Sequence, residues 1–207
     1  MANDLNGKRV AILATDGFEQ VELTEPMQAL KQAGARVEVV APKSGDIQGF
    51  NHHDKGQTVP VDHTLEQVQG EDFDALMLPG GVINPDALRL EPAAIDFIRH
   101  FVEARKPIAA ICHGPWTLIN AGGVQGRRMT SWPSLEADLR NAGAEWVDQD
   151  VVVDRGLVTS RKPDDLPVFC TAMVEEFSEG RHEEQPGGRI GSAQKGESAA
   201  TMQGENI

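Results

Sequence analysis

Short apolar runs alternate with longer amphipathic segments along most of the chain, and this alternation restricts the fold most strongly. The apolar runs end in turn residues and have the length of buried strands, while residues 91–105 carry apolar side chains at helical spacing. Strands that alternate with helices indicate βαβ units and a mostly parallel sheet with helices on both faces. We therefore expect an α/β fold with strands at residues 9–14, 36–41, 74–78 and 108–112.

The remaining segments give weaker expectations. Helical spacing predicts a helix over 19–34 that is kinked by Pro26 or broken near Thr24, and residues 42–63 are expected to be turn-rich with a small edge strand at 58–61. Further predicted elements are a helix over 134–142 capped by Ser134, a strand at 146–147, a hairpin of strands 151–154 and 157–160, and a closing helix over 164–177.

The length of 207 residues favours one domain, which we place at residues 1–178. Residues 179–207 are rich in glycine and polar side chains and hold few large apolar ones. Such a segment cannot bury enough surface to fold alone. We expect this C-terminal extension to lie across a neighbouring subunit or across the surface of its own domain.

The balance of charge excludes passive attraction to polyanions. Lysine and arginine number 19 against 32 acidic residues, which gives a formal charge of −13. Nucleic acid and anionic membranes are therefore not expected partners.

The sequence predicts a soluble cytoplasmic protein. Its two cysteines have no metal-binding or redox spacing, and it contains no signal-like or membrane-spanning apolar stretch.

The most informative motif is Pro-Ile-Ala-Ala-Ile-Cys-His-Gly-Pro-Trp at residues 107–116. It places Cys112 at the carboxyl end of a buried strand, on a sharp turn into a helix. We expect the helix N-terminus to lower the pKa of the thiol, and Cys112 to be a nucleophile. Neighbouring residues on such a turn point in different directions, so His113 need not contact Cys112 through its ring. The alternative is a buried structural cysteine, which is how we interpret Cys170.

Three other motifs follow predicted strands at the same edge of the sheet. Glu19 and Glu22 begin the first helix, where either could hydrogen-bond a thiolate or merely complement the helix dipole. Gly80-Gly81 could present backbone N–H groups as an oxyanion hole or form an ordinary turn. Asn84-Pro85-Asp86 reads as a turn that ends in a carboxylate able to orient a histidine.

No pattern supports a cofactor or metal. His52, His53 and His63 lie in a predicted loop without a cysteine or helical partner at zinc-site spacing. A Walker loop and a Gly-x-Gly-x-x-Gly motif after the first strand are both absent from the sequence. We therefore expect a cofactor-free site.

Together these motifs resemble the ThiJ/PfpI superfamily, which includes PfpI-type intracellular proteases and the parkinsonism-associated protein deglycase. The resemblance runs from about residue 8 to residue 177. It is carried by Asp-Gly-Phe-Glu-Gln-Val-Glu-Leu, Asp-Ala-Leu-Met-Leu-Pro-Gly-Gly, Ala-Ile-Cys-His-Gly-Pro and Leu-Val-Thr-Ser-Arg-Lys-Pro-Asp-Asp-Leu-Pro, in the family's order. The extension lies outside the family pattern.

The resemblance implies a flavodoxin-like three-layer sandwich with Cys112 as the reactive thiol. It implies that Glu22, rather than Glu19, is the buried acid beside the sulfur, and that the N–H groups of Gly81 and His113 form the oxyanion hole. It also implies a homodimer or dimer-based hexamer in which Asp86 of a neighbouring subunit faces His113. The loop before Asp86 is a residue longer than in some relatives, and several of them carry Glu there.

Three functions are compatible with these residues. The first is a stress-response enzyme that acts through Cys112 on reactive dicarbonyls or their early adducts on proteins, as a glyoxalase or deglycase does. The second is an intracellular cysteine peptidase of the PfpI type. The third is a redox-sensing or chaperone-like stress protein in which Cys112 is oxidised.

Overall fold

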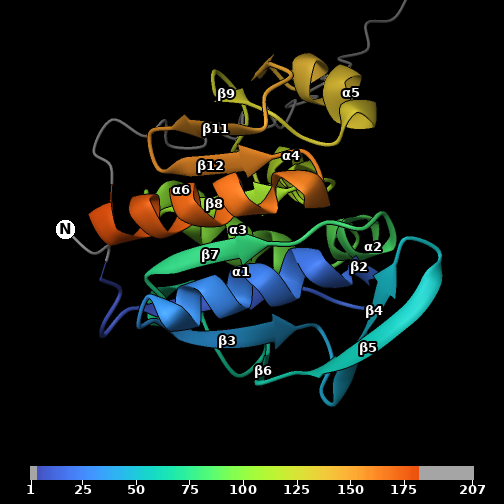
Figure 1. Cartoon of the computed structure of the whole chain (residues 1–207), viewed down its shortest axis with the longest axis vertical. Helices are drawn as coiled ribbons and strands as arrows, with labels where there is room; N and C mark the ends of the chain where they lie inside the picture. Colours follow the sequence, from blue (N-terminus) through green and yellow to red (C-terminus); the bar gives the residue numbers. More distant parts are fainter. Residues whose placement is uncertain (1–3, 182–207) are drawn as a thin grey trace, which may run out of the picture.

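The computed structural model describes residues 4–181 and contains a seven-stranded sheet (Figure 1). The strand order is β11-β12-β8-β7-β1-β3-β6, and only β11 runs antiparallel to its neighbour. The strands are β1 (Arg9–Leu13), β3 (Arg36–Ala41), β6 (His63–Thr64), β7 (Ala75–Leu78), β8 (Ile108–Ile111), β11 (Val151–Asp154) and β12 (Leu157–Ser160).

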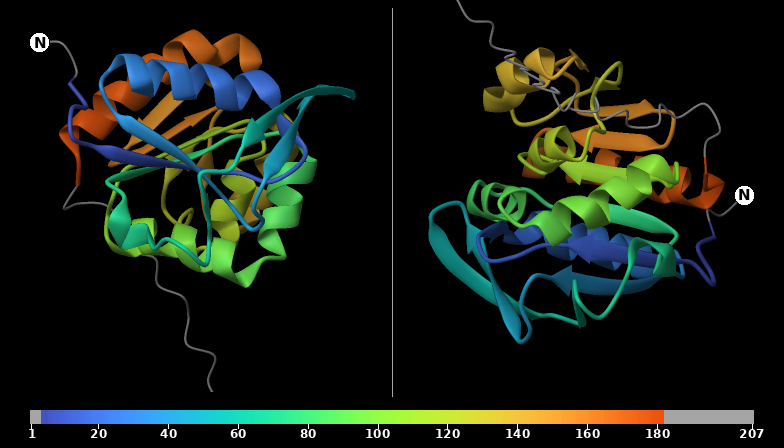
Figure 2. Two further views of the ribbon diagram at one scale, coloured as in Figure 1. Left: turned by 90° about the horizontal axis from the view of Figure 1, so that it is seen from below. Right: turned by 180° about the vertical axis from the view of Figure 1, so that it is seen from behind.

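Helices cover both faces of this sheet, as the alternating pattern predicts (Figure 2, left). Helices α1 (Gln20–Gln32) and α6 (Leu166–Glu179) lie on one face, and α2 (Ile83–Arg89), α3 (Pro92–Glu103) and α4 (Pro115–Asn120) lie on the other. Each face has its own buried apolar cluster, one built around Leu23, Leu30 and Phe169 and the other around Phe97, Phe101 and Leu118. The three-layer, flavodoxin-like α/β fold is thus confirmed.

The parallel register brings the motif-bearing segments to one edge. Strand β8 pairs with β7 on one side and β12 on the other, and β7 also pairs with β1. The segments that follow these four strands therefore leave the sheet side by side, at the side toward which the arrows of β3, β7 and β12 point in Figure 1.

Two smaller sheets lie outside the seven-stranded sheet. The first joins β2 (Phe18–Glu19) to the hairpin of β4 (Asp46–Asn51) and β5 (Asp54–Pro60), and the second pairs β9 (Arg128–Met129) with β10 (Glu145–Trp146). The hairpin corrects the expectation of a turn-rich segment with one edge strand at 58–61. Its side chains are largely exposed or half-buried, so the apolar signal of a strand is weak there.

Three expected elements differ in detail. Helix α1 continues through Pro26 without a break near Thr24, because Leu23, Pro26 and Leu30 are buried. Asn84-Pro85-Asp86 belongs to α2 rather than to a turn, since a proline in a first helical turn lacks only an N–H that has no helical partner there. The helix expected at 134–142 begins as a 3-10 turn (Pro133–Leu135) and continues as α5 (Glu136–Asn141), and Ser134 does not cap it.

The C-terminal extension predicted at 179–207 lies outside the described residues from position 182 onward. Its proposed contact with a neighbouring subunit or the domain surface therefore stays a prediction. Across residues 4–181, none of the helices combines the length and apolar character needed to cross a membrane.

Candidate active site

Cys112 occupies a strained turn between β8 and α4. Its φ angle is +60°, a conformation that a non-glycine residue rarely adopts. The Cys112 N–H donates to the Ser160 carbonyl at 3.0 Å, and its own carbonyl accepts from the Trp132 N–H at 2.8 Å. Gly114 lets the chain turn closely, since a Cβ there would lie 2.5 Å from the Leu78 carbonyl oxygen. This is the sharp strand-to-helix turn that the sequence predicts.

Glu22 is the acid that lies beside the sulfur. Its side chain is fully buried, its carboxyl group interacts with the Cys112 thiol, and its Oε2 atom accepts a hydrogen bond from the Gly80 N–H at 3.0 Å. The Oε1 atom has no hydrogen-bond partner among the described residues. Burial raises the pKa of Glu22 to about 8. An ionised carboxylate is costly to bury with one oxygen unpartnered, so the neutral acid is favoured at pH 7.

The thiol is not pre-ionised by the helix, which corrects a sequence-based expectation. Burial raises the pKa of Cys112, and the charge that Glu22 carries when ionised raises it further. Hydrogen bonds from the N–H groups of Gly81 and His113 act in the opposite direction. Helix α4 has only six residues, so its dipole is short and burial dominates. Removal of the thiol proton therefore requires a neighbouring base.

His113 is placed to be that base. Its Nδ1 atom lies 3.2 Å from the Cys112 sulfur, although the sequence did not lead us to expect a contact through the ring. Its Nε2 atom lies 3.4 Å from the Ser134 hydroxyl oxygen, and its ring stacks against Trp132 with centroids 6.0 Å apart. Burial lowers the pKa of His113, which keeps the imidazole neutral and able to accept a proton.

The backbone around Gly80 and Gly81 is held close to the sulfur. The N–H groups of Gly81 and His113 both point at Cys112, and Gly81 has a φ of +75°. A Cβ at Gly81 would lie 2.4 Å from the Gly17 carbonyl oxygen, so only glycine fits. Asn84 fixes this loop: its Nδ2 atom donates to the carbonyls of Pro79 and Gly80, and its Oδ1 atom accepts from the Thr15 N–H at 2.7 Å.

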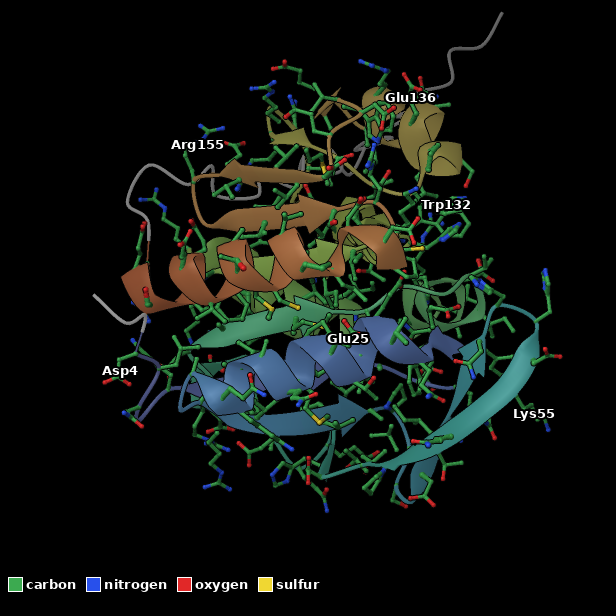
Figure 3. The ribbon with its side chains drawn as sticks, in the orientation of Figure 1. Asp4, Glu25, Lys55, Trp132, Glu136 and Arg155 are labelled. Carbon is green, nitrogen blue, oxygen red and sulfur yellow. The ribbon has the colours of Figure 1, made fainter. Side chains whose placement is uncertain are left out.

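A cleft of about 620 Å³ opens over Cys112. Its lining combines the aromatic side chains of Trp116 and Trp132 with acidic and histidine side chains. Trp132 lies at the side of the molecule where the parallel strands end (Figure 3). The other residues that line the cleft are Glu19, Glu22, His52, His53, Gly81, Val82, His113, Ser134, Leu135, Asp138 and Pro163.

Two of the predicted acids are not beside the sulfur. Glu19 reaches the cleft rim, where its Oε2 atom accepts a hydrogen bond from the His52 N–H at 3.1 Å. Asp86 is exposed on α2 and is not among the residues that line the cleft. Its predicted action on His113 of another subunit stays a prediction.

Sequence reasoning missed the cleft residues that come from the segment around Trp132 and from α5. Trp132 and Ser134 come from the segment Ser131-Trp132-Pro133-Ser134, and Asp138 follows on α5. A tryptophan between serine and proline is a signal for a rigid, exposed aromatic side chain, which could have drawn attention to this turn. His52 and His53 also reach the cleft, from the tip of the β4–β5 hairpin.

The donor groups do not assemble a metal site. Within residues 4–181, histidine, cysteine and acidic side chains form no group of three that could hold a metal ion. The side chains beside the sulfur, Glu22 and His113, instead offer one proton donor and one proton acceptor to a thiol.

Known proteins are similar in sequence to this chain over most of its length. A deglycase of Pyrococcus abyssi is 47% identical over 167 residues, which cover 81% of this chain and 98% of that protein. A Bacillus subtilis protein provisionally named a cysteine protease is 42% identical over 162 residues, which cover 78% of this chain and 94% of its own.

Solved structures share the fold. The DJ-1beta protein of Drosophila melanogaster superimposes with a TM-score of 0.75 at 29% identity, over 83% of this chain and 90% of its own. The sequence model of the DJ-1/PfpI family matches residues 8–176, which include Glu22, Gly81, Cys112 and His113. The chain therefore belongs to the DJ-1/PfpI family.

Proposed function

We propose that this protein is a cofactor-free cytoplasmic enzyme of stress defence that uses Cys112 to convert reactive dicarbonyls, or their early adducts on proteins, into hydroxy acids. The observation that carries the proposal is a strained cysteine whose sulfur faces a neutral acid, a neutral imidazole and two backbone N–H groups at the floor of a cleft. That combination suits addition of a thiol to a carbonyl carbon.

The first step forms a carbon–sulfur bond. His113 accepts the thiol proton at Nδ1, and the Cys112 sulfur attacks the aldehyde carbon of a dicarbonyl such as methylglyoxal. The carbonyl π electrons move to oxygen, which the N–H groups of Gly81 and His113 stabilise. Proton transfer from Glu22 or His113 to this oxygen gives a neutral hemithioacetal.

The second stage is internal redox without an external oxidant. A base takes the proton from the former aldehyde carbon, and the electron pair forms a carbon–carbon double bond while the adjacent carbonyl oxygen takes up a proton, which gives an enediol. The second carbon then receives a proton as the hydroxyl group on the first carbon loses one, so that the first carbon is oxidised to a thioester and the second is reduced to an alcohol. Water then attacks the thioester, the carbon–sulfur bond breaks, and lactate leaves with the thiol restored. One water is consumed for each methylglyoxal.

Substitution at Cys112 tests the proposal directly. Wild-type protein should form lactate from methylglyoxal, Cys112→Ala should form none, and Cys170→Ala should keep the wild-type rate. Cys170 is half-buried at a different pocket, which makes it the matched control. Lactate formation is measured because loss of methylglyoxal also occurs through its reaction with protein amines. Undiminished lactate formation by Cys112→Ala, or none by the wild type, refutes the proposal.

A peptidase is the second candidate, favoured by the name of the Bacillus subtilis relative. The same thiol and oxyanion hole could attack a peptide carbonyl, with His113 donating a proton to the leaving amine. Cys112-dependent cleavage of short fluorogenic peptides without lactate formation would support this function and displace the first.

We also propose that the protein assembles as a homodimer or dimer-based hexamer in which Asp86 of one subunit approaches His113 of another.

A further inference from the structure

We propose that the cleft selects its carbonyl substrates by charge, and accepts neutral and cationic compounds while it disfavours anionic ones. The inference rests on the proposed function, because it concerns substrates of the same Cys112 site. It assigns Glu19 and Asp138 as specificity-determining residues. Neither is needed for the chemistry at the sulfur.

The fixed charges that face the cleft are of one sign. Glu19 reaches it from β2 and Asp138 from α5, so the two carboxylates come from different elements of the cleft wall. None of the described residues that line the cleft is a lysine or an arginine. A substrate carboxylate or phosphate would therefore enter a negative field without a cation to bind it.

These two carboxylates are not neutralised by neighbours. Within the described part of the chain, neither Glu19 nor Asp138 forms an ion pair, and Glu19 accepts only the His52 N–H. Glu136, on the same helix as Asp138, shows the contrast: its carboxylate pairs with Arg140 at 2.8 Å. The charges of Glu19 and Asp138 therefore remain available to an incoming substrate.

The aromatic wall adds attraction for a cation. Trp132 is 38% exposed, and Trp116 also faces the cleft. Indole faces attract cations, as the guanidinium of Arg89 at 4.5 Å from the Trp116 ring centroid illustrates, so Trp132 is the indole that we expect to attract a cationic substrate. Arg89 donates to the Asn120 side chain at 2.7 Å and does not line the cleft.

Three histidines face the same space, and they set the conditions of the test. His52 and His53 lie at the rim and His113 beside the sulfur. Protonated imidazoles would offset the acids, so all substrates and variants are compared at a single pH of about 7.5. Glu22 also faces the cleft, but it is mostly neutral at this pH because burial raises its pKa to about 8.

The experiment compares para-substituted aryl glyoxals of different charge, and the neutral and cationic compounds are matched in size. Full-length protein is assayed with phenylglyoxals that carry a para-tert-butyl group, a para-trimethylammonium group or a para-carboxylate, and the mandelate products are quantified from initial rates. We expect kcat/KM for the cationic compound to exceed that for the anionic one by about tenfold, since the carboxylates of Glu19 and Asp138 form no ion pair and act on a bound substrate at short range. Salt should reduce this ratio.

Variants separate the cleft charges from the reactivity of the substituents and from the net charge of the protein. Glu19→Gln and Asp138→Asn should each reduce the cation-to-anion ratio about two- to threefold. Glu66→Gln removes an exposed acid that does not line the cleft and should leave the ratio unchanged. The ratio cancels any change in rate that is common to all substrates.

The outcomes distinguish this inference from the proposed function. Turnover of the neutral compound, with a ratio insensitive to salt and to both cleft substitutions, overturns charge selection and leaves the enzyme activity standing. A preference for the anionic compound likewise overturns charge selection and leaves the enzyme activity standing. Absence of product from all three compounds overturns the proposed function and the charge selection with it.

Discussion

Replacement of Glu22 by glutamine should make the stability of the protein less sensitive to alkaline pH. Burial raises the pKa of Glu22 from 4.5 in a model compound to about 8 in the folded protein. A group whose pKa is higher in the folded state stabilises that state most below its unfolded pKa, and this stabilisation is lost as pH rises through the folded pKa. The loss therefore extends from about pH 4.5 to about pH 8.

The size of the effect follows from the same shift. Each pH unit in this window removes about 1.4 kcal/mol of unfolding free energy for one proton. From pH 6 to pH 9, the wild type should lose about 3 kcal/mol through Glu22, because the loss continues only up to the folded pKa. Glutamine has no proton to release, so Glu22→Gln should lack this component while all other groups titrate as before.

Urea unfolding at pH 6 and pH 9 measures the difference. The free energy of unfolding of wild type, Glu22→Gln and the exposed control Glu66→Gln is determined at one protein concentration. We expect the control to follow the wild type and Glu22→Gln to lose about 3 kcal/mol less between the two pH values. Equal losses in all three proteins would show that Glu22 is ionised throughout, and would refute its assignment as a neutral acid.

Three further substitutions or treatments test individual parts of the site. Ser134→Ala should lower kcat about three- to tenfold and change the acid limb of the pH–rate profile, because the Nε2 atom of His113 loses its hydrogen-bond partner. Ser134→Thr keeps the hydroxyl group and should restore both kcat and the profile. An unchanged pH–rate profile in Ser134→Ala would contradict a positioning role for Ser134. Gly81→Ala should destabilise the protein by about 1–3 kcal/mol more than Gly126→Ala. Both glycines have a positive φ, but of the two only a Cβ at Gly81 would meet backbone atoms. Equal losses of stability in thermal unfolding would argue against the close approach of the Gly81 backbone to Gly17. Mild peroxide should add oxygen to Cys112 before Cys170, although burial raises the pKa of both thiols, because Cys112 has the His113 Nδ1 atom at 3.2 Å to take its proton and the N–H groups of Gly81 and His113 to stabilise the thiolate. Peptide mass spectrometry locates the added oxygen, and equal modification of the two cysteines would show that the surroundings of Cys112 do not activate its sulfur.

The fold was predictable where burial is strong on both sides of an element. Strand β3 has the bounds expected from the sequence, and β8 differs by one residue, because their residues are almost all buried; β8 reads as a continuous apolar run, and Val37, Val39 and Val40 mark β3. The β4–β5 hairpin was not predictable in this way, since its largely exposed or half-buried side chains give little apolar pattern. Helix α2 was hidden because Asn-Pro-Asp is compatible with both a turn and a first helical turn.

The sequence predicts which backbone segments come together at the site, but not the protonation of the thiol or the side-chain contacts between those segments. Cys112, Gly81 and Glu22 follow strands whose carboxyl ends meet, so topology brings them together. The sequence could not decide the pKa of Cys112, because the outcome depends on how burial balances against two N–H groups and a short helix. Nor could it place Ser134 against His113, since that contact joins segments 21 residues apart across the cleft.

The central claim is that Cys112 forms the covalent intermediate of the reaction, and acid quenching during turnover of methylglyoxal tests it most directly. A thioester survives acid, so the peptide that contains Cys112 should gain the mass of one methylglyoxal and lose it on treatment with hydroxylamine. Rapid lactate formation without such an adduct, or with the adduct on Cys170, would contradict the account.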